Sequence, residues 1–138
     1  MGLLIDSTVF IHAERHRQTP ADLLTELKDS WGDQAVALSV MSAAELFHGC
    51  WRADTPPRRA AREEFVAALL AVIPVVPITL AVARIFGQID AKLSAAGRRL
   101  PTSDLLIAST ALSLGDAIVT GNPRHFARVE GLSVHVLG

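Results

Sequence analysis

The sequence predicts an α/β fold with a mostly parallel central sheet of about five strands, flanked by helices. Short apolar runs alternate along the chain with stretches whose apolar residues recur at helical spacing, which is typical of a parallel sheet. Glycine, proline and capping residues separate these stretches. Half of the 138 residues are hydrophobic, which is enough to bury the core that such a sheet needs. We therefore expect one domain spanning residues 1–138.

The first half of the chain predicts two strands and four helices. Asp6 or Ser7 can cap the first helix, directly after a short apolar strand. Gly32 ends the second helix, whose leucines have helical spacing. Pro56 and Pro57 form a turn before the charged start of the fourth helix. The expected elements are, in order, a strand at 3–5, helices at 7–12 and 21–31, a strand at 35–40, and helices at 42–51 and 58–72.

The second half predicts three strands and two long helices. Pro74 and Pro77 interrupt the third strand and so place it at an edge of the sheet. Thr79 caps the next helix and Gly97 ends it, and Gly115 ends the last helix. The expected elements are a strand at 73–76, a helix with the face Val82, Phe86, Ile89 and Leu93, a helix capped by Thr102 or Ser103, strands at 117–120 and 133–136, and a short turn at 123–126 between them.

Composition and charge exclude several classes of protein. The net charge of −1 argues against strong non-specific DNA binding, although a local basic rim remains compatible with it. Cys50 is the only cysteine, so no disulfide framework or thiolate zinc cluster is expected, and a cytoplasmic location fits. No signal peptide is expected, because the N-terminal residues enter a strand without a basic region. Pro74 and Pro77 break the most apolar stretch, which is therefore not a membrane span.

Three acidic residues stand at comparable places in the predicted fold. Asp6, Glu45 and Asp104 each follow a strand or a loop and lie at or near the start of a helix. Carboxylates at the ends of parallel strands converge on one crevice, where α/β proteins bind ligands. Three such carboxylates without a basic partner repel one another unless a divalent cation lies between them. The sequence therefore indicates a metal site and, with it, phosphate chemistry.

Each of these acids also has a purely structural explanation. Asp6 can cap the helix that follows it. Ser42 and Glu45 have the spacing of a capping box. Asp104 can complement the dipole of its helix from the first turn. These explanations account for the residues separately, but they do not account for three acids at the same end of one parallel sheet.

A fourth site position lies just after the predicted strand at 117–120. Asn122 can offer a neutral oxygen to a metal or to its bound water, or it can simply be a turn residue before Pro123. Thr120 can hydrogen-bond a ligating carboxylate. Asp116 lies at the opposite end of the sheet and is excluded. Asp90 lies within a helix, where it belongs either to a solvated face or to a helix that leans over the crevice.

Four motifs follow one another along the chain, and each is weakly specific by itself. They are Asp6-Ser7-Thr8-Val9 after the first strand, Ala44-Glu45-Leu46-Phe47-His48-Gly49, Asp104-Leu105-Leu106-Ile107-Ala108 after the loop that begins at Gly97, and Val119-Thr120-Gly121-Asn122 followed by Phe126. In this order and spacing they resemble the PIN-domain ribonucleases, in particular the VapC-type toxins of bacterial toxin–antitoxin pairs. The resemblance covers essentially the whole chain.

The resemblance implies a PIN-like three-layer sandwich and a catalytic centre. It implies that Asp6, Asp104 and Glu45, the last directly or through water, bind Mg²⁺ or Mn²⁺. At the fourth place the family has an acid, or asparagine in some members, and here this place is Asn122. The family commonly forms homodimers, and a small VapB-like antitoxin encoded beside the toxin holds it inactive.

The predicted function is therefore metal-dependent hydrolysis of RNA phosphodiester bonds, which breaks the bond to the 3′ oxygen and leaves a 5′-phosphate. Ser7 and Thr120 are expected to support the ligating carboxylates. Arg98, Arg99 and Arg124 can grip the substrate, or they can serve surface solubility. The expected catalytic residues are Asp6, Glu45, Asp104 and Asn122.

Three rival functions have weaker support. A phosphatase with an aspartyl nucleophile needs a second acid two residues after the first, where this chain has Thr8. A phosphoryl-receiver module needs a lysine at a late strand end, and the chain's two lysines, Lys28 and Lys92, stand elsewhere. A catalytically impaired PIN-like module that only binds RNA or protein is favoured by Asn122 alone.

Other residues have open roles at this point. Phe47, Trp51 and Phe65 either form a dimer or antitoxin surface or belong to the core. His12 and His16 have the spacing of helical zinc ligands, but nothing completes a site around them.

Overall fold

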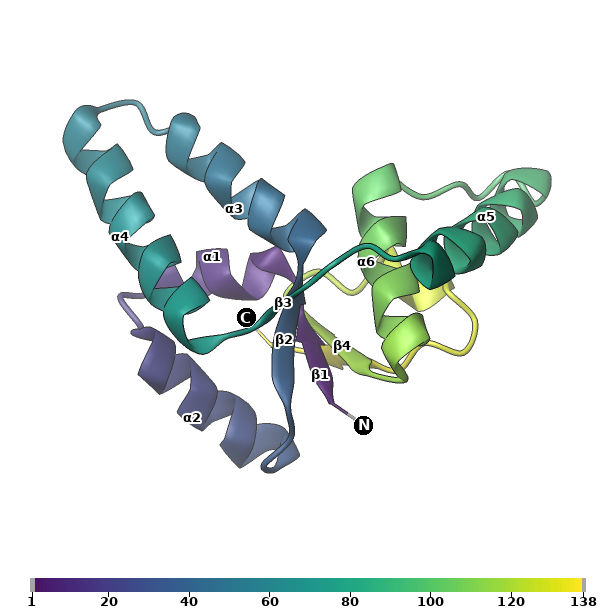
Figure 1. Cartoon of the computed structure of the whole chain (residues 1–138), viewed down its shortest axis with the longest axis horizontal. Helices are drawn as coiled ribbons and strands as arrows, with labels where there is room; N and C mark the ends of the chain where they lie inside the picture. Colours follow the sequence, from purple (N-terminus) through teal and green to yellow (C-terminus); the bar gives the residue numbers. More distant parts are fainter. Residues whose placement is uncertain (1, 138) are drawn as a thin grey trace.

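The computed structural model of the chain describes residues 2–137 and has a five-stranded sheet at its centre (Figure 1). The strands are β1 (Leu3–Ile5), β2 (Val36–Ser39), β3 (Val75–Val76), β4 (Ala117–Thr120) and β5 (Val134–Val136). Their order across the sheet is β3-β2-β1-β4-β5, and every pair is parallel. The α/β class is confirmed, and the sheet is parallel throughout rather than mostly. The prediction of β3 at an edge is confirmed as well.

Six α-helices cover the two faces of the sheet, so that the molecule has three layers. They are α1 (Ser7–Arg15), α2 (Pro20–Trp31), α3 (Val40–Trp51), α4 (Pro56–Val72), α5 (Leu80–Ala95) and α6 (Thr102–Leu114), with a short 3₁₀ helix, η1 (Phe126–Arg128), after β4. Figure 1 shows α1 to α4 on one side of the sheet and α5 with α6 on the other. Within residues 2–137, no helix is both long and apolar enough to cross a membrane.

Alternating side chains of the central strands build two separate cores. Leu3 and Ile5 point into the core shared with α1 to α4, whereas Leu4 between them points into the core shared with α6. In β4, Val119 and Ile118 divide in the same way. Because both faces of these strands are buried, their sequences are continuously apolar rather than alternating.

Two helices have a different N-cap from the one that the sequence predicts. The last residue of β2, Ser39, is itself the N-cap of α3, and its hydroxyl accepts a hydrogen bond from the Met41 amide at 3.0 Å. Ser42 therefore lies inside the helix, and the expected capping box with Glu45 is wrong. Helix α6 begins after Pro101, so neither Thr102 nor Ser103 is its cap. In α3 the difference arises because the chain turns from strand to helix without an intervening loop, and in α6 it arises because the proline that ends the preceding loop is itself the N-cap.

The remaining helix ends follow the expected capping chemistry. Thr55 and Thr79 accept hydrogen bonds from the amides three residues later and so cap α4 and α5. Pro56 and Pro57 are the first two residues of α4, so the predicted turn at these prolines is wrong and the helix starts two positions before the prediction. Gly115 ends α6 in the left-handed conformation, with φ +67°. The predicted α5 face is confirmed: Val82 is buried, and Phe86, Ile89 and Leu93 pack on the second core.

Candidate active site

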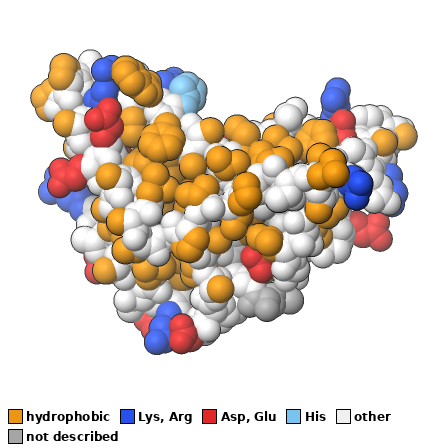
Figure 2. Space-filling model, in the orientation of Figure 1, with side chains coloured by type: hydrophobic (Ala, Val, Ile, Leu, Met, Phe, Trp, Pro, Cys, Tyr) orange, Lys and Arg blue, Asp and Glu red, His pale blue; other side chains and the backbone are white. Residues whose placement is uncertain are grey.

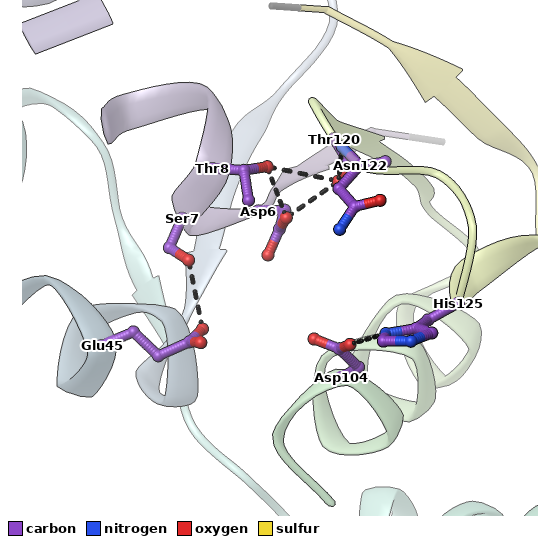
Figure 3. A network of polar contacts seen from close by, with 8 residues as sticks. All are labelled: Asp6, Ser7, Thr8, Glu45, Asp104, Thr120, Asn122 and His125. Carbon is purple, nitrogen blue, oxygen red and sulfur yellow. Dashed lines mark hydrogen bonds and ion pairs between the residues drawn. The ribbon is translucent and has the colours of Figure 1, made fainter. Parts of the chain in front are cut away.

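Asp6 lies directly after β1, at the carboxyl end of the central strand of the sheet, and its side chain is almost fully buried. Its backbone is the N-cap of α1, but its carboxylate caps no helix amide. Instead, Asp6 Oδ2 accepts hydrogen bonds from the hydroxyls of Thr8, at 2.6 Å, and Thr120, at 2.8 Å (Figure 3). The helix-capping explanation for this carboxylate is therefore wrong.

Glu45 is half-buried in α3, which continues from β2, the strand next to β1. Its carboxylate makes no bond to the start of its own helix; Glu45 Oε1 accepts a hydrogen bond from the Ser7 hydroxyl at 3.2 Å. This contact crosses from α3 to the first residue of α1. It brings the Glu45 carboxylate to the carboxyl end of the sheet, where Asp6 lies (Figure 3).

Asp104 lies in the first turn of α6, on the opposite face of the sheet from Glu45. Asp104 Oδ2 accepts a hydrogen bond from His125 Nδ1 at 2.6 Å. His125 follows β4 and immediately precedes η1. In Figure 3 the other oxygen of Asp104 points toward the space that Asp6 and Glu45 face.

The loop after β4 borders the space that the three acids face. The backbone amide of Asn122 donates to Thr120 Oγ1 at 3.0 Å, and that of Gly121 donates to Thr8 Oγ1 at 2.9 Å. Figure 3 places the Asn122 side-chain amide beside Asp6. The structure thus brings the four predicted positions Asp6, Glu45, Asp104 and Asn122 together around one space.

Burial and mutual repulsion set the electrostatics of these acids. Removal from water raises the pKa of Asp6, against the hydrogen bonds of Thr8 and Thr120, and the charge of Asp104 raises it further. Burial likewise raises the pKa of Glu45, followed by the charge of Asp6. Among the described residues, no lysine or arginine forms an ion pair with these three acids.

This donor set suits a divalent cation. Carboxylate oxygens are the preferred ligands of Mg²⁺ and Mn²⁺, and a cation would relieve the mutual repulsion that adds to the effect of burial on these pKa values. Within residues 2–137, no three histidine, cysteine or acidic side chains form a ready-made metal site. The site therefore fits a divalent cation by the kind of its donor atoms and by its negative charge. Direct ligation by all three acids would need their side chains to adjust.

Other candidate residues have separate contacts or are exposed. Asp90 is partly buried and pairs with Arg99, with 3.2 Å between Asp90 Oδ1 and Arg99 Nε. Arg98 and Arg124 are exposed. Asp116 accepts a hydrogen bond from the Gly2 amide at the opposite end of the sheet, as predicted.

A cleft of about 520 Å³ opens next to Glu45, between α1, α3 and α4. Phe10, Leu46 and Phe65 give it apolar walls, and Glu14 and Arg62 add charges of both signs. Phe65 also packs on the first core, whereas Phe47 and Trp51 are exposed on α3. Of the three aromatic residues whose roles the sequence leaves open, Phe65 thus belongs to the core, and Phe47 and Trp51 belong to the surface.

Thr8 and His125 are contacts of the site that the sequence does not reveal as such. Thr8 stands where a phosphatase with an aspartyl nucleophile would need its second acid. Its position two residues after Asp6 is the only sequence signal that it hydrogen-bonds the Asp6 carboxylate. His125 lies 21 positions from Asp104. Only the fold brings that pair together.

Comparisons with known proteins identify the family of this chain. The family model of the PIN domain matches residues 3–132. Ribonuclease VapC2 of Haemophilus influenzae is 30% identical over 129 residues, which cover 94% of this chain and 92% of that protein. The tRNA(fMet)-specific endonuclease VapC of Shigella flexneri is 30% identical over 132 residues, with coverages of 96% and 95%.

Solved structures share the fold over the full length. VapBC2 from Rickettsia felis, bound to a DNA fragment from its promoter, superposes with a TM-score of 0.83 at 20% identity and full coverage of both chains. VapBC-5 from Mycobacterium tuberculosis gives a TM-score of 0.73 at 26% identity, covering 99% of this chain and 96% of that one.

Proposed function

Because the chain belongs to the PIN-domain family and is a VapC-type ribonuclease, we propose that Asp6, Glu45 and Asp104 form its catalytic centre, with Asn122 beside them. One observation carries this assignment. Three acids from three separate elements face one space at the carboxyl end of the sheet, and no lysine or arginine of the described chain neutralises them. Stability alone does not favour such an arrangement.

Asp6, Asp104 and Glu45, the last directly or through water, would hold Mg²⁺ or Mn²⁺ here. When bound, the ion supplies an activated water and neutralises charge on the phosphate. The chain's own groups prepare this chemistry. Thr8 and Thr120 hold one oxygen of Asp6, and Ser7 holds one oxygen of Glu45, so that each acid keeps a second oxygen free.

The reaction we propose is hydrolysis of an RNA phosphodiester. Water attacks the phosphorus, the bond from phosphorus to the 3′ oxygen breaks, and the products carry a 5′-phosphate and a 3′-hydroxyl. Arg98 and Arg124 are exposed and free to contact substrate phosphates. Arg99 would have to leave its contact with Asp90 to do so.

The same proposal includes an antitoxin partner. A relative of this chain, VapBC-5 from Mycobacterium tuberculosis, is crystallised as a member of the VapBC family of toxin–antitoxin systems. We place the partner, a VapB-like antitoxin, in the cleft beside Glu45, because apolar walls and charges of both signs suit an amphipathic peptide. Occupation of this cleft would restrict access to the catalytic space. An RNA substrate also implies that the chain acts in the cytoplasm.

A homodimer completes the proposal. Apolar side chains spread over the face of the molecule drawn in Figure 2, in the region where Figure 1 shows α3, β3 and the start of α5. We call this surface the apolar face. We define it by the exposed large apolar residues on and next to these elements, which are Val40, Phe47, Trp51, Val75, Ile78 and Leu80. Exposed apolar surface of this kind marks a protein contact, and a second copy of the chain is the partner we propose.

The first experiment compares the wild type with Asp6→Asn on mixed structured RNA, with Mn²⁺ and with a chelator. Asparagine keeps an oxygen that can accept from Thr8 and Thr120, so the variant should fold. We expect cleavage only by the wild type and only with the metal. An active Asp6→Asn variant would rule out this centre. A folded wild type that binds RNA without cutting it would point to a binding module instead.

A further inference from the structure

A short hydrogen bond ties Asp104 to a residue outside the predicted catalytic set. His125 Nδ1 lies 2.6 Å from Asp104 Oδ2, and the two side chains are 31% and 23% exposed. The contact joins the loop after β4 to the first turn of α6. A bond this short, made at a partly buried position, fixes the rotation of the carboxylate.

The backbone that presents His125 is itself well held. Phe126, the next residue, is buried in the second core with 2% of its surface exposed. The carbonyl of Pro123 accepts a hydrogen bond from the Ala127 amide at 2.9 Å, which closes the turn around His125. Packing of Phe126 and the closed turn therefore hold the backbone of His125, and with it the imidazole, in place.

The three acids of the site share one pattern of hydrogen bonding. Asp6 uses one oxygen to accept from threonine hydroxyls, and Glu45 uses one oxygen to accept from Ser7. Asp104 uses one oxygen to accept from His125. In each case the partner comes from a neighbouring side chain, and the second oxygen stays available on the side of the common space (Figure 3).

We propose that His125 is a positioning residue, which orients Asp104 toward the catalytic space as Thr120 orients Asp6 and Ser7 orients Glu45. The inference rests on the proposed function, because it assigns His125 a role in holding a metal ligand. Hydrogen-bonded partners of ligating groups commonly change metal affinity by about 10- to 100-fold. A merely structural bridge between the loop and α6 would change stability and leave metal affinity unaltered.

The test measures Mn²⁺ affinity by the electron paramagnetic resonance signal of the free ion, together with thermal unfolding. His125→Ala removes the donor, and we expect Mn²⁺ to bind about 10- to 100-fold more weakly. His125→Asn places an amide N–H near the position of Nδ1 and should restore most of the affinity. His16→Ala is the matched control, since His16 bonds the His12 carbonyl and stacks on its ring at the C-cap of α1, the end of that helix opposite Asp6.

The outcomes separate the inference from the function on which it rests. If the wild type binds Mn²⁺ and cuts RNA while His125→Ala binds Mn²⁺ equally well or more tightly, the positioning role is wrong and the proposed function stands. If the wild type neither binds Mn²⁺ nor cuts RNA, both are wrong. If His125→Ala fails to fold, His125→Gln replaces it, because its amide lies further out, near the position of the ring's Nε2, and unchanged affinity there would equally contradict the inference.

Discussion

Thr120 Oγ1 donates a hydrogen bond to Asp6 Oδ2 at 2.8 Å, across 114 positions of sequence. Thr120 is the last residue of β4 and Asp6 is the first residue after β1, and these strands are neighbours in the sheet. The adjacent strand therefore holds the Asp6 carboxylate in place through this bond. The same hydroxyl accepts the Asn122 amide, so one side chain holds both the acid and the loop beside it.

Thr120→Val should destabilise the chain and the site together. Valine keeps the shape but removes a donor to a carboxylate and leaves the Asn122 amide without its acceptor. We expect a loss of about 1.5–3 kcal/mol in the free energy of unfolding, measured by urea titration, and weaker binding of Mn²⁺. Thr110→Val is the control, because that buried hydroxyl bonds only the Leu106 carbonyl within α6. Equal losses in both variants would argue against a special role for Thr120.

Asp6→Asn should stabilise the metal-free chain at neutral pH. Burial raises the pKa of Asp6 above its usual 3.8, so the folded state favours the protonated acid. The contribution of Asp6 to stability is then fully present below pH 3.8 and is lost as the pH rises through the raised pKa. Asparagine has no charge to bury. The advantage of the variant should therefore grow with pH in urea titrations with chelator present.

Glu45→Gln provides the comparison for that experiment, since burial also raises the pKa of Glu45. It should show the same trend with pH. A difference between Asp6→Asn and the wild type that stays constant across the whole pH range would mean that titration of Asp6 is not its source.

The sequence predicts the fold well where the signals are local. The apolar run of β1 ends at Asp6 and that of β4 follows Asp116, and burial on both faces explains why these runs are continuously apolar. Helix starts are less predictable. Ser39 serves both β2 and α3, and the apolar residues Val40 and Met41 extend the strand pattern into what is already a helix. A pattern of apolar residues does not show where the backbone changes direction.

The acids of the site are predictable from sequence, but most of their partners are not. Asp6 follows β1, Asp104 lies in the first turn of α6 and Glu45 lies in the helix that continues from β2, and the topology of a parallel sheet then brings them to one edge. Their hydrogen bonds depend on side-chain distances across elements. Ser7 and Thr120 are next to motif residues and could be proposed, whereas His125 meets Asp104 only through the packing of η1 beside α6.

Divalent cations should stabilise the wild type against heat. An ion that binds only the folded chain contributes about 2.7 kcal/mol at one hundred times its dissociation constant, which corresponds to a Tm increase of roughly 10 °C for a chain of this size. Differential scanning fluorimetry with Mn²⁺, with Mg²⁺ and with chelator measures it. Asp6→Asn should lose most of the increase. An increase of the same size in Asp6→Asn would place the ion elsewhere on the chain.

Leu80→Glu should weaken the proposed homodimer without unfolding the protomer. Leu80 is 68% exposed at the start of α5, so a charge there disturbs little of the core. If the apolar face is buried between two copies, loss of one leucine contact costs about 1.5–3 kcal/mol and raises the dissociation constant of the dimer at least about tenfold. Light scattering after size exclusion measures the mass. Leu114→Glu, at an exposed leucine at the end of α6, is the control and should leave the dimer intact. A monomeric wild type, or a dimer that Leu80→Glu leaves unchanged, would show that the apolar face is not the contact between copies.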